Sequence, residues 1–232
     1  MIIGICGLIG SGKGTVADIL VENHNFHKLS FADKLKDGVA SVFGWDRDML
    51  EGDTDRSRIW REKADDFWSN ETGKEVTPRL VLQLFGTDCM RNGFFDGIWV
   101  SLVKQKILEN PDTNWVIPDV RFPNEVQMIQ SVYGEVWQVR RGELPNWFLE
   151  KRDNNIEPSD VHASEWAWID KDSAFEQIIQ NDGSLEELLE LVKLEEPYIH
   201  QITKMFLCYL TLLNMPQIIM DHLEMLLEVN LN

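Results

Sequence analysis

The 232-residue chain has few cysteines, few basic residues and no long apolar run. Its three cysteines, Cys6, Cys89 and Cys208, lack metal-ligand spacing, so we expect reduced, mostly buried thiols in a reducing cytosol. No segment approaches the ~20 apolar residues of a membrane-spanning helix. The N-terminus has neither the basic region nor the cleavage site of a signal peptide. We therefore expect a cytoplasmic protein without a membrane partner.

Positive charge is scarce and unevenly distributed. The formal net charge is −17, of which residues 1–141 carry −4 and residues 142–232 carry −13. A chain this acidic is poorly suited to holding a nucleic acid backbone, so no direct nucleic acid partner is expected. We interpret the acidic last third as a solvated surface. An anionic small substrate would need a locally basic pocket, which gives the positions of the ten arginines particular weight.

One glycine-rich stretch near the N-terminus carries the clearest chemical signal. Residues 7–15 read GLIGSGKGT, between the apolar run 2–6 and a segment with helical spacing. Strand, glycine-rich loop, lysine and helix in this order predict a phosphate-binding loop (P-loop), in which backbone N–H groups and Lys13 bind phosphate oxygens. The usual pattern places Ser or Thr directly after the lysine. Here Gly14 stands in that position and the hydroxyl follows at Thr15.

Strands and helices alternate along the chain, which predicts a three-layer α/β/α fold with a parallel sheet. The expected strands are residues 2–6, 27–31, 115–119, 135–139 and 175–180. The expected helices are residues 16–20, 32–43, 77–85, 99–108, 125–132 and 185–194. Thr77 and Ser184 are expected N-caps, Glu187 completes a capping box, and residues 86–88 are expected to interrupt the third helix.

Two segments lack the alternating pattern and one apolar tail follows it. Residues 44–77 are interpreted as a helical insertion, either a surface helix or a substrate lid. Residues 142–165, with two prolines and many charges, are expected to form a mobile, lid-like loop. The kinase-like domain would span residues 1–194. The tail 195–232 is expected to be helical, packing on the same core or forming a homodimer interface.

Several stretches resemble the deoxynucleoside monophosphate kinases of tailed bacteriophages, within the wider P-loop nucleoside monophosphate kinase family. They are the GSGKGT form of the P-loop, SFADKLK at 30–36, PRLVLQLFGTD at 78–88, PDVRFPNE at 118–125, DVHASE at 160–165 and NDGSLEEL at 181–188. The resemblance covers residues 1–194 and implies transfer of the γ-phosphoryl group of ATP to a (deoxy)nucleoside 5′-monophosphate. For a phage-encoded chain, the compartment would be the host cytoplasm.

The resemblance also implies roles for individual residues. Donor phosphates and ATP would be bound by Gly10, Ser11, Gly12, Lys13, Gly14, Thr15 and Arg141. The acceptor nucleotide would be bound by Phe31, Lys36, Arg79, Gln83, Gly86, Thr87 and Trp99. Lys13, Arg79, Asp119 and Arg121 would be catalytic, with Mg²⁺ held by Thr15 and, through water, by Asp119. His162, Ser164 and Glu165 would brace the lid-like loop.

The residues themselves leave alternatives open. Asp119 ends an apolar run, which places it at the carboxyl end of a strand, where ligands gather in parallel sheets; it could instead cap the next element. Arg79 could form a surface ion pair, Trp99 could be core, and His162 could be a structural hydrogen-bonding group. Phage relatives often carry Asp where this chain has Gly14, and a basic residue where it has Leu80, so those roles do not transfer.

The expected reaction needs no general base, because the acceptor phosphate oxygen is already ionised near neutral pH. This agrees with the lack of any Ser-His-Asp or paired-carboxylate pattern. A dephospho-coenzyme A kinase and a non-catalytic nucleotide-binding protein are the two alternative functions. The sequence does not identify the base or the sugar of the acceptor.

Overall fold

A five-stranded parallel sheet forms the centre of the protein. The computed structural model describes residues 1–161, 163–170 and 172–193. The strands are β1 (Ile2–Cys6), β2 (Phe26–Lys28), β3 (Asn114–Ile117), β4 (Glu135–Arg140) and β5 (Gln177–Gln180). Their order in the sheet is β2-β3-β1-β4-β5, and every neighbouring pair is parallel. The predicted parallel α/β fold is confirmed, although β2 begins one residue earlier and ends three residues earlier than expected.

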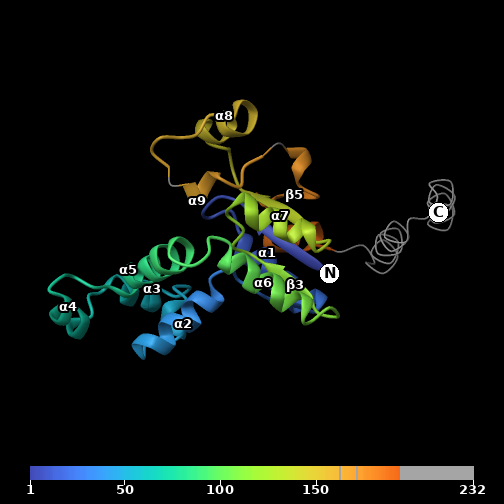
Figure 1. Cartoon of the computed structure of the whole chain (residues 1–232). Coiled ribbons are helices and arrows are strands. Elements are labelled where there is room, and N and C mark those ends of the chain that lie inside the picture. The colour runs from blue at the N-terminus through green and yellow to red at the C-terminus, as the bar shows by residue number, and fades with distance from the viewer. Residues whose placement is uncertain (162, 171, 194–232) are drawn as a thin grey trace, which may run out of the picture.

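Helices connect these strands and cover the sheet (Figure 1). The α-helices are α1 (Lys13–His24), α2 (Asp33–Phe43), α3 (Asp55–Glu62), α4 (Asp66–Thr72), α5 (Pro78–Gln83), α6 (Ile98–Leu108), α7 (Pro123–Ser131), α8 (Asn146–Asn154), α9 (Ala163–Trp166) and α10 (Leu185–Leu191). Two 3₁₀ turns, η1 (Asp48–Leu50) and η3 (Asp172–Ala174), and a π-helix, η2 (Leu84–Asn92), complete the described part of the chain.

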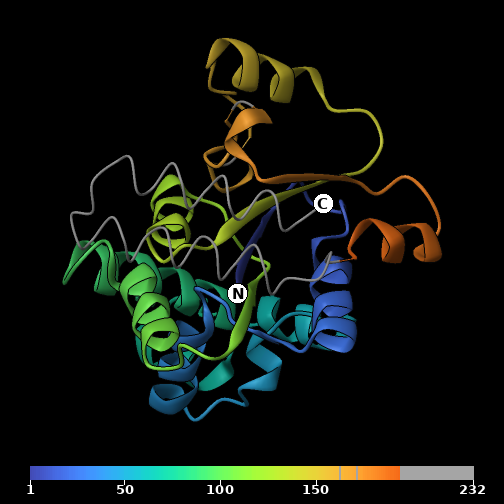
Figure 2. The ribbon, with the colours of Figure 1, turned by 90° about the vertical axis from the view of Figure 1, so that its right-hand side faces the viewer.

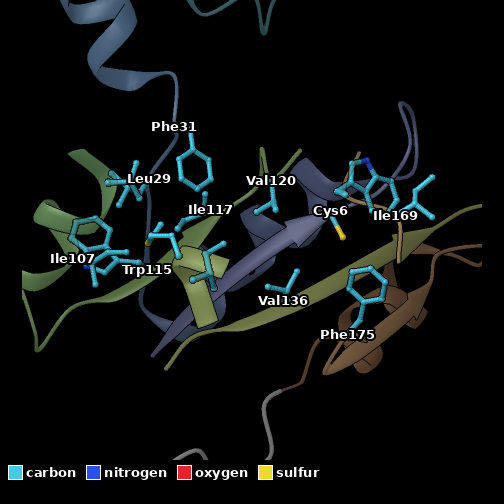
Figure 3. Packing of buried hydrophobic residues seen from close by; sticks show 14 of the residues in the cluster. Cys6, Leu29, Phe31, Ile107, Trp115, Ile117, Val120, Val136, Ile169 and Phe175 are labelled. Carbon is cyan, nitrogen blue, oxygen red and sulfur yellow. The ribbon is translucent and has the colours of Figure 1, made fainter. Parts of the chain in front are cut away.

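Alternation along the strands separates two cores, one on each face of the sheet. Ile3 and Ile5 of β1 face α1 and α10, with Val16, Leu20 and Leu188 in the same cluster. The opposite face packs under α6 and α7, and Figure 3 shows this cluster around residues such as Ile107, Ile117 and Val136. Because side chains alternate between the faces of a strand, β1, β3, β4 and β5 contribute to both cores, whereas β2 contributes only Phe26, to the core under α1. Both faces of the sheet are therefore covered, as a parallel sheet requires.

The insertion between α2 and α5 is helical, as expected, and shares a small core with these two helices. Val39, Leu50 and Val81 are buried there. Phe43 stacks on Trp45 with 4.7 Å between ring centroids, and Trp60 meets Trp45 edge-on at 5.8 Å. In Figure 1 these blue to teal helices stand apart from the sheet, on a different side from α8. The insertion is thus a packed helical unit rather than a loose surface loop.

Two local expectations are wrong. Residues 86–88 do not interrupt the helix that begins at Pro78, because the chain continues without a break as the π-helix η2. Gly86 allows α2 to pack closely against η2, because a Cβ at Gly86 would lie 3.0 Å from the Leu35 side chain of α2. Residues 142–165 are also not a simple loop, since they contain α8 and the start of α9. Phe148 anchors α8 in the main core, where it is fully buried and packs near Trp168.

The cysteine expectation holds for one residue and fails for another. Cys6 is buried and its pKa is raised by that burial, whereas Cys89 of η2 is exposed, so the expectation that it is buried is wrong. Cys208, His162 and the tail 195–232 lie outside the described residues. The expected N-caps are confirmed, because Thr77 accepts the N–H of Leu80 and Ser184 forms a capping box with Glu187.

Candidate active site

The P-loop connects β1 to α1 at the carboxyl edge of the sheet. Gly7, Gly10 and Gly12 have φ values of +150°, +79° and +97°, which side chains on L-residues disfavour. A Cβ at Gly7 would lie 2.3 Å from the Val139 carbonyl of β4, so the loop packs directly against its neighbouring strand. The helix that follows begins at Lys13, and its first N–H groups are available to an anion. The loop therefore has the backbone form that phosphate binding requires.

Lys13 folds back over the loop. Its ammonium group donates to the carbonyl oxygens of Gly7 and Leu8, at 2.7 Å and 2.8 Å. Burial lowers the pKa of Lys13, and the positive charge of Arg121 lowers it further, while Glu165 acts in the opposite direction. These three charged groups therefore share one electrostatic environment. A bound phosphate would relieve the repulsion between Lys13 and Arg121.

Asp119 lies just after β3, as expected for a ligand-binding acid at a strand end. Its Oδ2 accepts the Ser30 hydroxyl at 2.6 Å, and its Oδ1 lies 3.4 Å from the Phe31 N–H. Burial raises the pKa of Asp119, opposed by the two hydrogen bonds and by the charge of Lys36. Among the described residues it forms no salt bridge. A partly buried carboxylate without a salt bridge is a suitable partner for a divalent ion.

Arg121 follows in the same β3–α7 loop and is fixed at both its main chain and its side chain. The guanidinium pairs with Glu165 of α9 at 2.9 Å. The backbone N–H donates to Glu125 at 2.6 Å, and the N–H of Phe122 donates to the same carboxylate oxygen at 3.0 Å. Burial is the main cause that raises the pKa of Glu125, to about 7. Arg91 of η2 lies 4.0 Å from the other oxygen of Glu125.

The residues expected at the acceptor site are spread over α2, α5, η2 and α6. Lys36 pairs with Glu51, and Arg79 pairs with Glu62 of the insertion at 2.7 Å while its side chain is 54% exposed. Trp99 is buried and donates from Nε1 to the Gly86 carbonyl at 3.1 Å. Three more expected residues divide between core and surface: Phe31 is buried, whereas Gln83 and Thr87 are exposed.

The P-loop and the start of the lid-like segment enclose a small pocket of about 130 Å³. Gly10, Ser11 and Arg141, all expected at the donor site, are among the residues that line it. The hydroxyl of Ser11 is buried without a hydrogen-bond partner in the described part of the chain. Gly14 and Thr15 are exposed in the first turn of α1, and a Cβ at Gly14 would meet no atom within 4 Å.

The structure also reveals site residues that the sequence did not indicate as functional. Ser30, Arg91 and Glu125 contact Asp119 or the loop that carries Arg121. For Glu125 a signal existed, since a glutamate at the third position of a helix that starts with proline is typical of a capping box. No local pattern distinguishes Ser30 or Arg91. Figure 2 shows α8, the gold helix at the top of the view, above the strands of the sheet.

The parallel sheet and the glycine-rich loop after β1 define the class of protein: an α/β protein with a P-loop after its central strand. The comparison with family models then identifies the group. The model of the deoxynucleotide monophosphate kinase family matches residues 54–192, and the chain belongs to that family.

Individual relatives agree with this assignment. The chain is 29% identical over 199 residues to a putative deoxynucleotide monophosphate kinase of Acanthamoeba polyphaga mimivirus, covering 81% of this chain and 91% of the relative. It is 25% identical over 180 residues to the deoxynucleoside-5′-monophosphate kinase of Escherichia phage T5, covering 56% of this chain and 72% of the relative. The expected resemblance to viral kinases is confirmed.

Solved structures with a similar arrangement include shikimate kinase from Aquifex aeolicus and dephospho-CoA kinase from Campylobacter jejuni. They are 13% and 14% identical, with TM-scores of 0.39 and 0.38. Each comparison covers 82% of this chain, and 92% and 93% of the respective structures. No helix in the described part of the protein is long and apolar enough to cross a membrane.

Proposed function

We propose that this protein transfers the γ-phosphoryl group of ATP to a deoxynucleoside 5′-monophosphate, giving ADP and a deoxynucleoside diphosphate. Family membership supports the reaction type and the class of substrate. One observation supports the proposal for the site: Arg121 and Glu165 form an ion pair, and the charges of both change the pKa of Lys13 in the P-loop. Two cations close to a phosphate-binding loop are what the transfer of a charged phosphoryl group requires.

In this proposal the P-loop N–H groups and Lys13 hold the donor phosphates. Lys13 exchanges its two hydrogen bonds to loop carbonyls for bonds to phosphate oxygens. Arg121 would stabilise the negative charge on the transferring group, a role supported by the effect of its charge on the pKa of Lys13. No residue has to remove a proton from the acceptor, whose phosphate oxygen is already ionised. Catalysis is thus assigned to positioning and to preorganised positive charge.

Thr15 and Asp119 fit Mg²⁺ by their chemistry. Both offer oxygen atoms, and Asp119 is a partly buried carboxylate without a salt bridge in the described residues. Groups of three or more acidic, His or Cys side chains that could hold a metal do not occur in that part of the chain. Mg²⁺ in kinases is usually bound by one or two carboxylates together with substrate phosphates. The ion would supply charge neutralisation and orientation to the phosphates.

The acceptor would lie between the β3–α7 loop and the helices of the insertion. The proposed residues for its binding remain Phe31, Lys36, Arg79, Gln83, Gly86, Thr87 and Trp99. Arg79 would have to leave Glu62 to reach a substrate, and its exposed side chain allows that movement. Trp99 would support the acceptor site indirectly, by fixing the position of the π-helix η2. Its indole N–H donates to the Gly86 carbonyl and does not face solvent. The insertion 44–77 and the segment 142–165 would close over the substrates and exclude water.

The test is a coupled assay for ADP formation with a panel of acceptors. The panel contains dAMP, dGMP, dCMP, dTMP, the corresponding ribonucleotides and dephospho-coenzyme A. We expect turnover with at least one deoxynucleotide, and loss of turnover by three orders of magnitude or more in Lys13→Met and Arg121→Ala while both still fold. Turnover with dephospho-coenzyme A alone, or ATP binding without any transfer, would overturn the proposal. Normal turnover in either variant would remove the role given to that residue.

A further inference from the structure

Asn181, in the loop between β5 and α10, contacts the P-loop although the two lie 170 residues apart. Its side-chain amide donates from Nδ2 to the Ser11 carbonyl oxygen at 2.9 Å. Its own backbone N–H donates to the Arg140 carbonyl at 2.8 Å, which extends the pairing of β5 with β4. The residue is only 9% exposed. None of the roles described above uses it.

The contact depends on the glycine that follows Ser11. A Cβ at Gly12 would lie 2.2 Å from the Asn181 amide nitrogen, a distance that no side chain can occupy. Gly12 also has a φ of +97°, so its backbone form and its lack of a side chain are both needed. The Asn181 side chain can therefore occupy its position only because residue 12 is glycine.

The hydrogen bond to Ser11 has a direct consequence for phosphate binding. In a trans peptide the C=O of one residue and the N–H of the next point in opposite directions. Holding the Ser11 carbonyl towards Asn181 therefore turns the Gly12 N–H to the opposite side of the same peptide. That N–H is one of the donors that a P-loop offers to a phosphate oxygen.

The neighbouring residue connects the same loop to the lid-like segment. Asp182 accepts the N–H of Gly142 at 2.6 Å, and this hydrogen bond, then that of the Gln180 amide and, least, the charge of Arg141 lower the pKa of Asp182. Gly142 is the first residue of the proposed lid and Arg141 is a proposed donor-site residue. Asn181 and Asp182 thus join the P-loop to the point where the lid begins.

We propose that Asn181 is a positioning residue that holds the P-loop in its phosphate-binding form and thereby sets the affinity for the triphosphate donor. The inference deepens the proposed function, on which it rests for the identity of the donor. It assigns to the β5–α10 loop a role on the donor side alone, because its contacts are with the P-loop and with residues 140 and 142. The acceptor should be bound as before when Asn181 is changed.

Two variants and one control test this role. Asn181→Ala removes the hydrogen bond, and Asn181→Asp keeps the shape but places an acceptor against the Ser11 carbonyl. Ser184→Ala is the matched control in the same loop, because it removes the N-cap of α10 without touching the P-loop. ATP and ADP binding are measured by calorimetry, and hydrogen exchange is followed in the peptide spanning residues 7–15. Steady-state assays then give separate KM values for donor and acceptor.

We expect about tenfold weaker ATP binding in Asn181→Ala, the change that the loss of one buried hydrogen bond produces. Asn181→Asp should be weaker still above neutral pH, and exchange in residues 7–15 should be faster in both. Ser184→Ala should lower the melting temperature, with the ATP affinity and the exchange of the P-loop unchanged. The acceptor KM should stay within twofold in all three.

The outcomes separate this inference from the proposed function. ATP binding and P-loop exchange equal to wild type in both Asn181 variants would overturn the inference, even in a fully active kinase. An equal loss of ATP affinity in Ser184→Ala would also overturn it, since the effect would then follow from stability. Weaker ATP binding in the Asn181 variants of a protein that phosphorylates no monophosphate would support the inference and refute the kinase function.

Discussion

The buried carboxyl of Glu125 predicts a measurable pH dependence of stability. Glu125 is 3% exposed and its pKa is raised from the usual 4.5 to about 7, mainly by burial. Between these two values the folded protein holds a proton on Glu125 that the unfolded chain has lost. The free energy of unfolding therefore falls as pH rises through this window, and becomes constant above it. Over the whole window the loss amounts to about 3 kcal/mol, at roughly 1.4 kcal/mol per pKa unit.

The perturbation is Glu125→Gln, which keeps the volume and an oxygen that can accept the N–H groups of Arg121 and Phe122. Urea denaturation of both proteins between pH 5.5 and pH 8 gives the difference in unfolding free energy. The wild type should lose about 2 kcal/mol relative to the variant across this range. Glu176→Gln is a suitable control, because Glu176 also accepts a backbone N–H, that of Val136, but is exposed.

The reasoning would be refuted by a difference between wild type and Glu125→Gln that does not change with pH. A difference that favours the wild type more strongly as pH rises would refute it as well. That result would mean that the two N–H groups and Arg91 outweigh burial and hold the carboxylate in its charged form. The same slope in Glu176→Gln would show that the pH dependence arises from net charge rather than from Glu125.

Two further predictions follow from Gly14 and Trp99. Gly14→Asp should raise the melting temperature, because the position is open, glycine costs a helix about 1 kcal/mol, and an acidic side chain is favourable in the first turn of a helix. In calorimetric titrations the same variant should bind ATP more weakly than Gly14→Ala does, because the added negative charge repels the phosphates. Trp99→Phe should destabilise the protein by about 2 to 3 kcal/mol in urea unfolding, since it leaves the buried Gly86 carbonyl without its donor and opens a cavity. A melting temperature unchanged in Gly14→Asp, or unchanged unfolding in Trp99→Phe, would contradict these arguments.

The parts of the fold that follow from local chemistry were predictable from the sequence. The glycine pattern before Lys13, the apolar runs of β1, β3 and β4, and the capping residues Thr77 and Ser184 each act within a few residues. Asp119 was predictable as well, because a polar residue that ends a buried strand must lie at the sheet edge.

The parts that depend on distant contacts were not predictable in this way. Gly86 suggested a break, yet the helix continues as η2 because Leu35 packs closely against that glycine. The charged segment around α8 suggested a mobile loop, yet a single aromatic residue, Phe148, anchors it in the core. The contact of Asn181 with Ser11 joins residues that no local pattern relates. In each case a tertiary contact overrides a weak local preference.

The strand order explains why the site divides into two halves. β1 is central, with β3 and β2 on one side and β4 and β5 on the other, so the P-loop lies between two sets of strand ends. The ends of β2 and β3 bring Ser30 to Asp119, beside Arg121. The ends of β4 and β5 bring Arg141 and Asn181 to the P-loop.

Gly14 lies between these halves, exposed and without steric neighbours. A larger residue would therefore be accommodated, and the absence of the acid that phage relatives often carry there has no steric cause. In the proposed mechanism the positive charge of Arg121 and the carboxylate of Asp119 both come from the β3–α7 loop, on one side of the P-loop. The proposed charged groups therefore do not depend on a side chain at position 14, and the ATP titration of Gly14→Asp tests whether an added acid weakens donor binding.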